Sequence, residues 1–197
     1  MEKNAKDVIE ALMPLVEALE DSGIAYYLGG SVASSAYGVS RPTQDIDVIA
    51  DIRIEHVLPL VRRLKSEYYV DADMIRDAIR RKSSFNIIYL DLMFKVDIFL
   101  PKPRQFTQQE LLHIRKEVIA EGTRPFYLSS PEDIILNKLE WYKMGAEVST
   151  RQWNDLMGVI NRQKTTLDLA YLRQWAKELD VVELLERALA QSGIRES

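Results

Sequence analysis

The sequence contains no cysteine. Disulfide bonds, zinc sites built on thiolates and thiol nucleophiles are therefore excluded. Basic residues are also in the minority, with 26 Lys and Arg against 30 Asp and Glu and a formal net charge of −4. Proteins dedicated to duplex nucleic acid usually carry a basic balance, so the total argues against that class, although it leaves room for a local basic patch.

Long apolar runs are absent as well. No stretch approaches the roughly 18 apolar residues that cross a bilayer. Residues 1–7 are polar and charged, unlike a signal peptide. We therefore expect a cytosolic protein that does not enter a membrane. Apolar residues still make up 47% of the 197 residues, enough for one medium domain, or a small domain with a helical appendage.

Hydrophobic periodicity divides the chain into two parts. The first part mixes helical and strand patterns, whereas after Ser130 we count four helical patterns and no good strand. We therefore predict a mixed α+β fold: a core sheet with flanking helices over residues 1–128, and a C-terminal helical bundle over 129–197. The pattern predicts helices over 8–19, 31–37, 54–67 and 71–82 and after Thr107, and strands over 24–28, 45–50, 68–70, 85–90, 93–100 and 125–128.

The strongest chemical signal is a pair of acids in a predicted strand. Alternate residues of a strand share a face, so Asp45 and Asp47 point the same way while Ile46 and Val48 point into the core. Two neighbouring carboxylates repel each other and are tolerated best with a cation between them. Carboxylate oxygens without a nearby histidine or cysteine suit magnesium or manganese.

A glycine turn precedes this strand in the chain. Gly29, Gly30 and Ser31 lie where a strand ends and a helix begins, so free backbone N–H groups and the helix dipole favour an anion there. Gly30 lets a phosphate approach the backbone, and Ser31 is expected either to cap the helix or to bind a phosphate oxygen. An anion site and a cation site then face each other, as a magnesium-bound triphosphate requires.

A third carboxylate would complete a two-metal site. Asp97 is the best candidate because it lies in an apolar strand, where a lone acid is costly to bury; a structural salt bridge is the alternative. Asp91 lies at an expected turn and needs no metal to explain it. Asp71 and Asp73 repeat the same spacing but precede a helical run, so we interpret them as first-turn acids.

These motifs resemble those of a known superfamily. Three segments, together with residues 130–139, look like the DNA polymerase β-type nucleotidyltransferases, and in particular their bacterial branch of abortive-infection toxins. The three segments are Leu28-Gly29-Gly30-Ser31, Asp45-Ile46-Asp47-Val48 after a thirteen-residue gap, and Val96-Asp97-Ile98. The resemblance implies transfer of a nucleoside monophosphate from a nucleoside triphosphate such as ATP to a hydroxyl, with pyrophosphate leaving.

The resemblance also implies residue roles. Asp45 and Asp47 would bridge the metals, Asp97 would bind the second metal and help deprotonate the acceptor, and Gly29, Gly30 and Ser31 would hold the triphosphate. Lys138 matches a lysine that reaches the phosphates, although from the residues alone a surface lysine is as good a reading. Arg41, in the loop between the two motifs, is either a further phosphate ligand or a plain turn residue. The catalytic and metal residues are thus Asp45, Asp47 and Asp97, and the nucleotide-binding residues Gly29, Gly30, Ser31, Arg41 and Lys138.

One departure separates the chain from the toxins. They often carry a Lys-Asp pair after an arginine, whereas here Trp153-Asn154-Asp155 follows Arg151, so that only Asp155 remains. We therefore keep two functions open. One is a magnesium-dependent enzyme acting on an RNA end, a protein or a small molecule, as in the toxin of a toxin–antitoxin pair with an antitoxin-like partner. The other is a module that binds nucleotide or a partner without turnover. The histidines, His56 and His113, receive no role.

Overall fold

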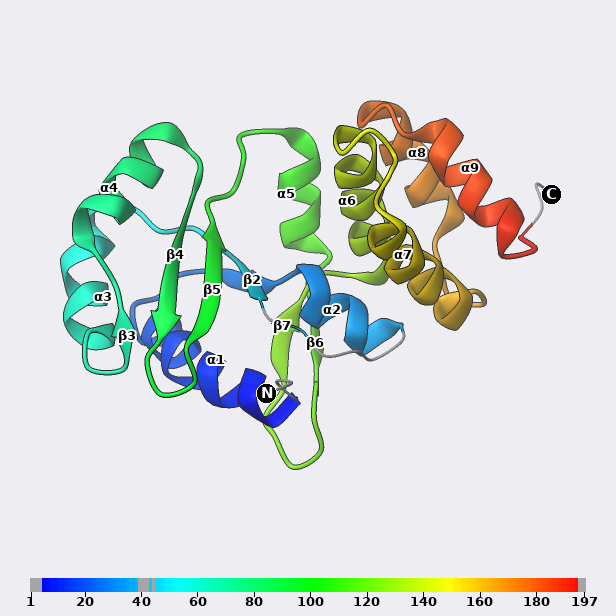
Figure 1. Cartoon of the computed structure of the whole chain (residues 1–197). Coiled ribbons are helices and arrows are strands. Elements are labelled where there is room, and N and C mark those ends of the chain that lie inside the picture. The colour runs from blue at the N-terminus through cyan, green and yellow to red at the C-terminus, as the bar shows by residue number, and fades with distance from the viewer. Residues whose placement is uncertain (1–4, 39–42, 44, 195–197) are drawn as a thin grey trace.

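A computed structural model describes residues 5–38, 43 and 45–194. Within them the chain forms one mixed sheet with flanking helices, and a group of helices follows the last strand (Figure 1). The predicted α+β class is confirmed. The strands are β1 (Tyr26–Leu28), β2 (Asp45–Ala50), β3 (Tyr68–Tyr69), β4 (Ser84–Tyr89), β5 (Phe94–Phe99), β6 (Arg115–Glu117) and β7 (Phe126–Leu128). The helices are α1 (Ala5–Asp21), α2 (Gly30–Tyr37), the 3-10 helix η1 (Ile54–His56), α3 (Val57–Leu64), α4 (Ala72–Arg81), α5 (Gln105–Leu112), α6 (Pro131–Met144), α7 (Thr150–Gln163), α8 (Leu169–Glu178) and α9 (Val182–Gln191).

The strand order brings distant segments of the chain together. The sheet runs β3-β4-β5-β2-β1-β7-β6. β2 is parallel to β5 and antiparallel to β1, and β1 is parallel to β7. Because β1 and β7 point the same way and lead into α2 and α6, the N-termini of these two helices come to the same edge of the sheet. α2 and α6 also pack against each other.

Helix α1 covers the sheet through its apolar stripe and contains Pro14. The Tyr68 hydroxyl, from β3, donates to the Ala11 carbonyl oxygen at 2.7 Å and accepts from the Leu15 N–H at 3.2 Å. It therefore bridges two backbone groups next to the proline, where the regular helical ladder is interrupted. The helix ends at Asp21, and Gly23, with a φ of +65°, allows the turn into β1.

Some element bounds differ from the prediction. β6 was missed because Arg115, Lys116 and Glu117 carry no apolar alternation, and the strand exists only through its pairing with β7. The helix expected over 54–67 is a 3-10 turn followed by the shorter α3, which ends at Leu64. α5 begins at Gln105, before Thr107.

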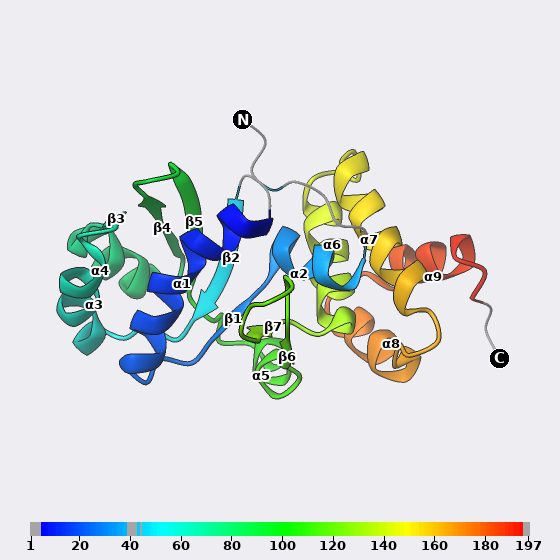
Figure 2. The ribbon, with the colours of Figure 1, turned by 90° about the horizontal axis from the view of Figure 1, so that it is seen from below.

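After Ser130, the described residues form four helices and no strand, as predicted. Helix α2 lies between the sheet and the helices α6 and α7 (Figure 2). At its end the backbones come close: a Cβ added at Gly38 would lie 3.0 Å from the Val159 amide nitrogen. The division into parts 1–128 and 129–197 stays a prediction, and α2 links them closely.

In the part of the chain that the structure describes, no helix has the length and apolarity needed to cross a membrane.

Candidate active site

The two acids of β2 lie on one face of the sheet, as their spacing predicts. Ile46 and Val48 are fully buried, while Asp45 and Asp47 occupy the alternate positions on the more open face. β5 lies beside β2 in parallel, and its Asp97 is paired in register with Asp47. Side chains paired in this way project from the same face of neighbouring strands. Asp45, Asp47 and Asp97, which we call the acid face, are therefore neighbours.

Lys95 also belongs to this face, two residues before Asp97 and paired in register with Asp45. Its ammonium Nζ lies 2.8 Å from Asp97 Oδ2 and 3.9 Å from Asp45 Oδ1. The lysine side chain is about half exposed. The alternative expected for Asp97, a structural salt bridge, has its partner in Lys95.

The glycine turn lies directly beside Asp47. The Gly29 N–H donates to the Asp47 carbonyl oxygen at 3.0 Å, which joins the end of β1 to β2. Gly30 has a φ of +51°, and a Cβ added there would lie only 1.7 Å from Asp47 Oδ2. The Asp47 carboxylate therefore lies directly over the Gly30 backbone, which a side chain at position 30 would block.

Of the two roles expected for Ser31, that of helix cap is wrong, and that of phosphate ligand stays a prediction. The N-cap of α2 is Gly29, and Ser31 is the second residue of the helix. The backbone N–H of Ser31 hydrogen-bonds to the Asp47 carboxylate. A negative charge is thus present at the positive end of α2, as expected for a helix N-terminus, but it is supplied by the chain itself.

The electrostatics of Asp47 follow from this position. Burial raises the pKa of its carboxyl above the usual value, and the negative charge of Asp97 raises it further. The Ser31 N–H and the more distant Lys138 ammonium act in the opposite direction. A bound cation would relieve the repulsion between Asp47 and Asp97.

Lys138 lies on α6 and is buried, so the reading as a surface lysine is wrong. Its Nζ lies 3.1 Å from Asp155 Oδ2 and 3.3 Å from Gln152 Oε1, both on α7. The ammonium also stabilises the negative charge of Asp47. Lys138 therefore joins α6 to α7 and directs a positive potential at the acid face. Asp155, the acid that remains after Arg151, is its partner.

Comparison with known proteins rests on three-dimensional structure. No family model and no curated protein matches the sequence. The solution structure of the antibiotic-resistance factor ANT(2'')-Ia is similar with a TM-score of 0.55 at 15% identity, covering 96% of each chain. A nucleotidyltransferase-like protein from Paracoccidioides brasiliensis gives 0.60 at 15%, covering 92% of this chain and 90% of that one. The lincosamide adenylyltransferase LnuA gives 0.51 at 14%, covering 81% of this chain and 98% of that one. The chain has the fold of a nucleotidyltransferase.

In this nucleotidyltransferase fold, the acid face offers donors that fit a divalent cation. All three are carboxylates, which magnesium prefers, and the Lys95 ammonium shows that a positive charge fits between two of them. Within the described residues, no three acidic or histidine side chains are arranged to hold a metal ion. Asp97 instead pairs with Lys95, and Asp47 accepts from the start of α2.

Three further residues that the sequence singled out do not contribute to the described acid face. Arg41 lies outside the described residues. Asp91 is exposed at the turn between β4 and β5, as predicted. Asp71 caps α4 by accepting from the backbone N–H groups of Asp73 and Met74, so these acids belong to a helix start, as interpreted.

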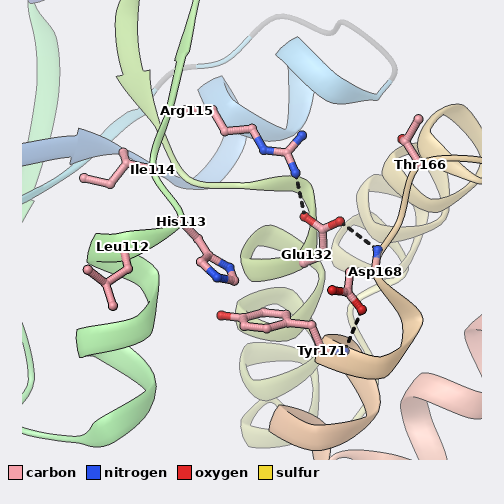
Figure 3. Close-up of a pocket in the computed structure, with 8 residues that line it drawn as sticks. All are labelled: Leu112, His113, Ile114, Arg115, Glu132, Thr166, Asp168 and Tyr171. Atoms are coloured by element: carbon pink, nitrogen blue, oxygen red, sulfur yellow. Dashed lines mark hydrogen bonds and ion pairs between the residues drawn. The ribbon is translucent and has the colours of Figure 1, made fainter.

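A pocket of about 350 Å³ lies elsewhere in the nucleotidyltransferase fold (Figure 3). His113, to which sequence reasoning gave no role, stacks there against Tyr171 with ring centroids 4.3 Å apart. Arg115 reaches the buried Glu132 at 3.3 Å. Arg115 is on β6, three strands from the β2 that carries Asp45 and Asp47 and four from the β5 that carries Asp97, or roughly 14 and 19 Å at the usual strand spacing. The pocket is therefore too far away to hold an atom that reacts at the acid face.

Sequence reasoning also missed a buried polar cluster where α5 meets α6. Asn137 Nδ2 donates to Glu110 Oε1 at 2.6 Å, and Asp133 accepts from Ser130 Oγ and from the Tyr171 hydroxyl, each at 2.7 Å. Burial raises the pKa of Glu110 to about 7, and it also raises the pKa of Asp133. The only signal in the sequence was the presence of acids within apolar helical patterns.

Proposed function

We propose that the protein is a magnesium-dependent nucleotidyltransferase that moves a nucleoside monophosphate from a nucleoside triphosphate to a hydroxyl acceptor. One observation carries the proposal: Asp97 is in register with Asp47, and Asp45 shares their face, beside the glycine turn that begins α2. Three acids on one face repel one another, and the single Lys95 ammonium offsets only part of their charge. Two separate strands supply them, so they are not a local sequence effect.

The residues divide the work as follows. Asp45, Asp47 and Asp97 would hold magnesium, which supplies charge neutralisation and acidifies the attacking hydroxyl when it is bound. The N–H groups at the start of α2 would hold phosphate oxygens, and Lys138 would add positive potential. Asp97 would accept the proton of the acceptor hydroxyl as its oxygen attacks the α-phosphorus. The bond from that phosphorus to the bridging oxygen breaks, and pyrophosphate leaves.

The acceptor is proposed as a hydroxyl on a small molecule, an RNA end or a protein. LnuA is described with lincomycin bound, and ANT(2'')-Ia has been solved with adenylyl-2''-tobramycin. Small hydroxyl compounds of these two kinds are therefore the first to test. A toxin-like role with an antitoxin-like partner is a separate hypothesis. Growth arrest on expression of the wild type, but not of an Asp45→Asn, Asp47→Asn variant, would support it.

Asp97→Asn is the decisive variant for the enzyme. Label transfer from α-labelled nucleotide should fall about 100-fold or more, because an amide does not accept the proton. Triphosphate binding should be largely kept, since a group needed mainly in the transition state affects turnover more than binding. Asp91→Asn, at the exposed turn, is the matched control. An Asp97→Asn protein with a lowered melting temperature and wild-type transfer would show that Asp97 is only a salt-bridge partner.

The second candidate is a nucleotide-binding module without turnover. The salt bridge of Lys95 to Asp97 favours it, because an acid held by an ammonium is not free to accept a proton. Calorimetry with magnesium and each nucleoside triphosphate, combined with the label-transfer assay, separates the two. Binding without transfer to any small-molecule, RNA or protein pool would favour the module.

A further inference from the structure

Two carboxylates of the acid face, Asp97 and Asp47, already contact groups of this chain that resemble the expected ligands. The Lys95 ammonium lies between Asp97 and Asp45, at 2.8 and 3.9 Å, where a cation would bind. The Asp47 carboxylate accepts the Ser31 N–H at the start of α2, where a phosphate would bind. The site without ligand is therefore neutralised in part by its own side chains.

We infer that Lys95 is the resident counter-ion of the acid face: it competes with a lone divalent cation, and it makes metal binding depend on the triphosphate. The inference rests on the proposed function and adds a determinant of metal affinity to it. Lys95 is a positioning residue, because it acts by holding the Asp97 and Asp45 carboxylates.

The physical reason is a balance of charge. A divalent cation that arrives alone has to displace the ammonium from Asp97, and it has to draw Asp47 away from the Ser31 N–H. A metal–triphosphate complex brings a phosphate oxygen for that N–H together with a cation for the carboxylates. Metal and triphosphate should therefore bind with positive coupling, each raising the affinity for the other.

A plainer reading is that Lys95 is an ordinary cross-strand lysine. Its side chain is 46% exposed, and exposed ion pairs often contribute little to stability. On that reading, its removal leaves the affinity for metal unchanged.

The test measures metal binding directly. Mn²⁺ is titrated by calorimetry into the wild type and into Lys95→Gln, first alone and then as preformed Mn²⁺–tripolyphosphate, which has no base. We expect Lys95→Gln to bind Mn²⁺ alone at least ~10-fold more tightly, because a positive charge within contact distance has been removed. Affinity for the preformed complex should rise less, so that the coupling falls.

Lys143→Gln is the matched control. Lys143 is 44% exposed and lies 2.6 Å from Asp180, far from the acid face in the sequence and on a different element, so its removal should leave Mn²⁺ binding unchanged. Adding Asp45→Asn and Asp97→Asn to Lys95→Gln should abolish the gain. Circular dichroism shows whether each variant is folded.

The outcomes separate this inference from the proposed function. Suppose that the wild type binds the preformed complex, and that the affinities of Lys95→Gln and the wild type for Mn²⁺ alone agree within about twofold. The role of Lys95 is then refuted and the proposed function stands. If neither the wild type nor Lys95→Gln binds the preformed complex, both the role of Lys95 and the proposed function are overturned. A gain that survives removal of Asp45 and Asp97 would place the metal elsewhere and overturn the counter-ion role.

Discussion

At the scale of single residues, Gly30 is required for two separate reasons. Its φ of +51° is in the region that residues with a side chain rarely adopt. A Cβ would also meet the Asp47 carboxylate at 1.7 Å. The sequence argument placed a phosphate against this backbone, and in the structure the Asp47 carboxylate lies there; phosphate binding at Gly30 stays a prediction.

Gly30→Ala should therefore affect more than backbone strain. We expect it to move Asp47, to lower stability by more than the ~1 kcal/mol typical of a positive φ, and to abolish metal-dependent nucleotide binding. Gly122→Ala is the matched control, because Gly122 has a φ of +77° and nothing within 4 Å of an added Cβ. Urea unfolding and calorimetry compare the two. Equal losses of stability with intact nucleotide binding would show that Asp47 moves aside at no cost.

At the scale of elements, the contact between α5 and α6 should depend on pH. Burial raises the pKa of Glu110 to about 7, from the 4.5 usual for a glutamate. Between these values the folded protein binds more protons at Glu110 than the unfolded chain does, so the contribution of Glu110 to stability is greatest at low pH and is lost as pH rises towards 7. Asp133 and Asp47, whose pKa values are also raised, contribute with the same sign.

Glu110→Gln should remove the glutamate's share of this fall. The amide oxygen can still accept from Asn137, and it does not ionise. Relative to the wild type, the variant should gain stability as the pH rises from about 5 to about 7, by at most about 1.4 kcal/mol per pH unit. Urea unfolding at several pH values measures this, with the exposed Glu178→Gln as control. Parallel curves for wild type and Glu110→Gln would show that Glu110 titrates normally.

The buried pair of Lys138 and Asp155 joins α6 to α7 and offers a way to separate structure from function. Their side chains are only 8% and 11% exposed. Lys138→Met leaves the Asp155 charge without its ammonium and should cost about 3–5 kcal/mol. Adding Asp155→Leu should restore most of that stability, since an apolar pair can replace a buried ion pair.

Nucleotide affinity then decides the role of Lys138. If Lys138 binds phosphate, the double variant should bind nucleoside triphosphate more weakly than the wild type does, even though its stability is restored. Calorimetry measures this affinity. A double variant that is stable and binds like the wild type would leave Lys138 with a structural role alone. Lys143→Met, in an exposed pair, should change stability by less than about 1 kcal/mol.

Local patterns predicted most elements, and tertiary pairing decided the rest. β2 runs from Asp45 to Ala50 as predicted, because its alternation reports a half-buried strand. β6 has no such alternation and depends on β7. For the site, the spacing of Asp45 and Asp47 was enough to place both on one face. The contact of Lys95 with Asp97 and the burial of Lys138 against Asp155 require knowing which strands and helices are neighbours, which spacing does not give.

At the scale of the whole molecule, the helical part supports the sheet part. α2 packs on β2 and also on α6 and α7, and Gly38 meets the backbone of α7. A chain cut after Ser129 would expose the apolar side of α2 and of the sheet edge to water. We expect this fragment to aggregate or to lack a cooperative unfolding transition. Circular dichroism with thermal melting and sedimentation test this. A monomeric fragment that melts cooperatively would show that residues 1–129 fold alone.

The register of β2 and β5 has a kinetic consequence. Asp47 and Asp97 are 50 positions apart, whereas β4 and β5 form a short hairpin and β1 lies near β2 in sequence. Closing a long loop costs more entropy than closing a short one, so the local pairs should form before β2 meets β5. Each half of the acid face then forms within its own local unit, and the complete face arises only when the two units dock. In refolding experiments, capacity to bind Mn²⁺–tripolyphosphate should therefore appear later than the far-ultraviolet circular dichroism signal; simultaneous recovery would contradict this order.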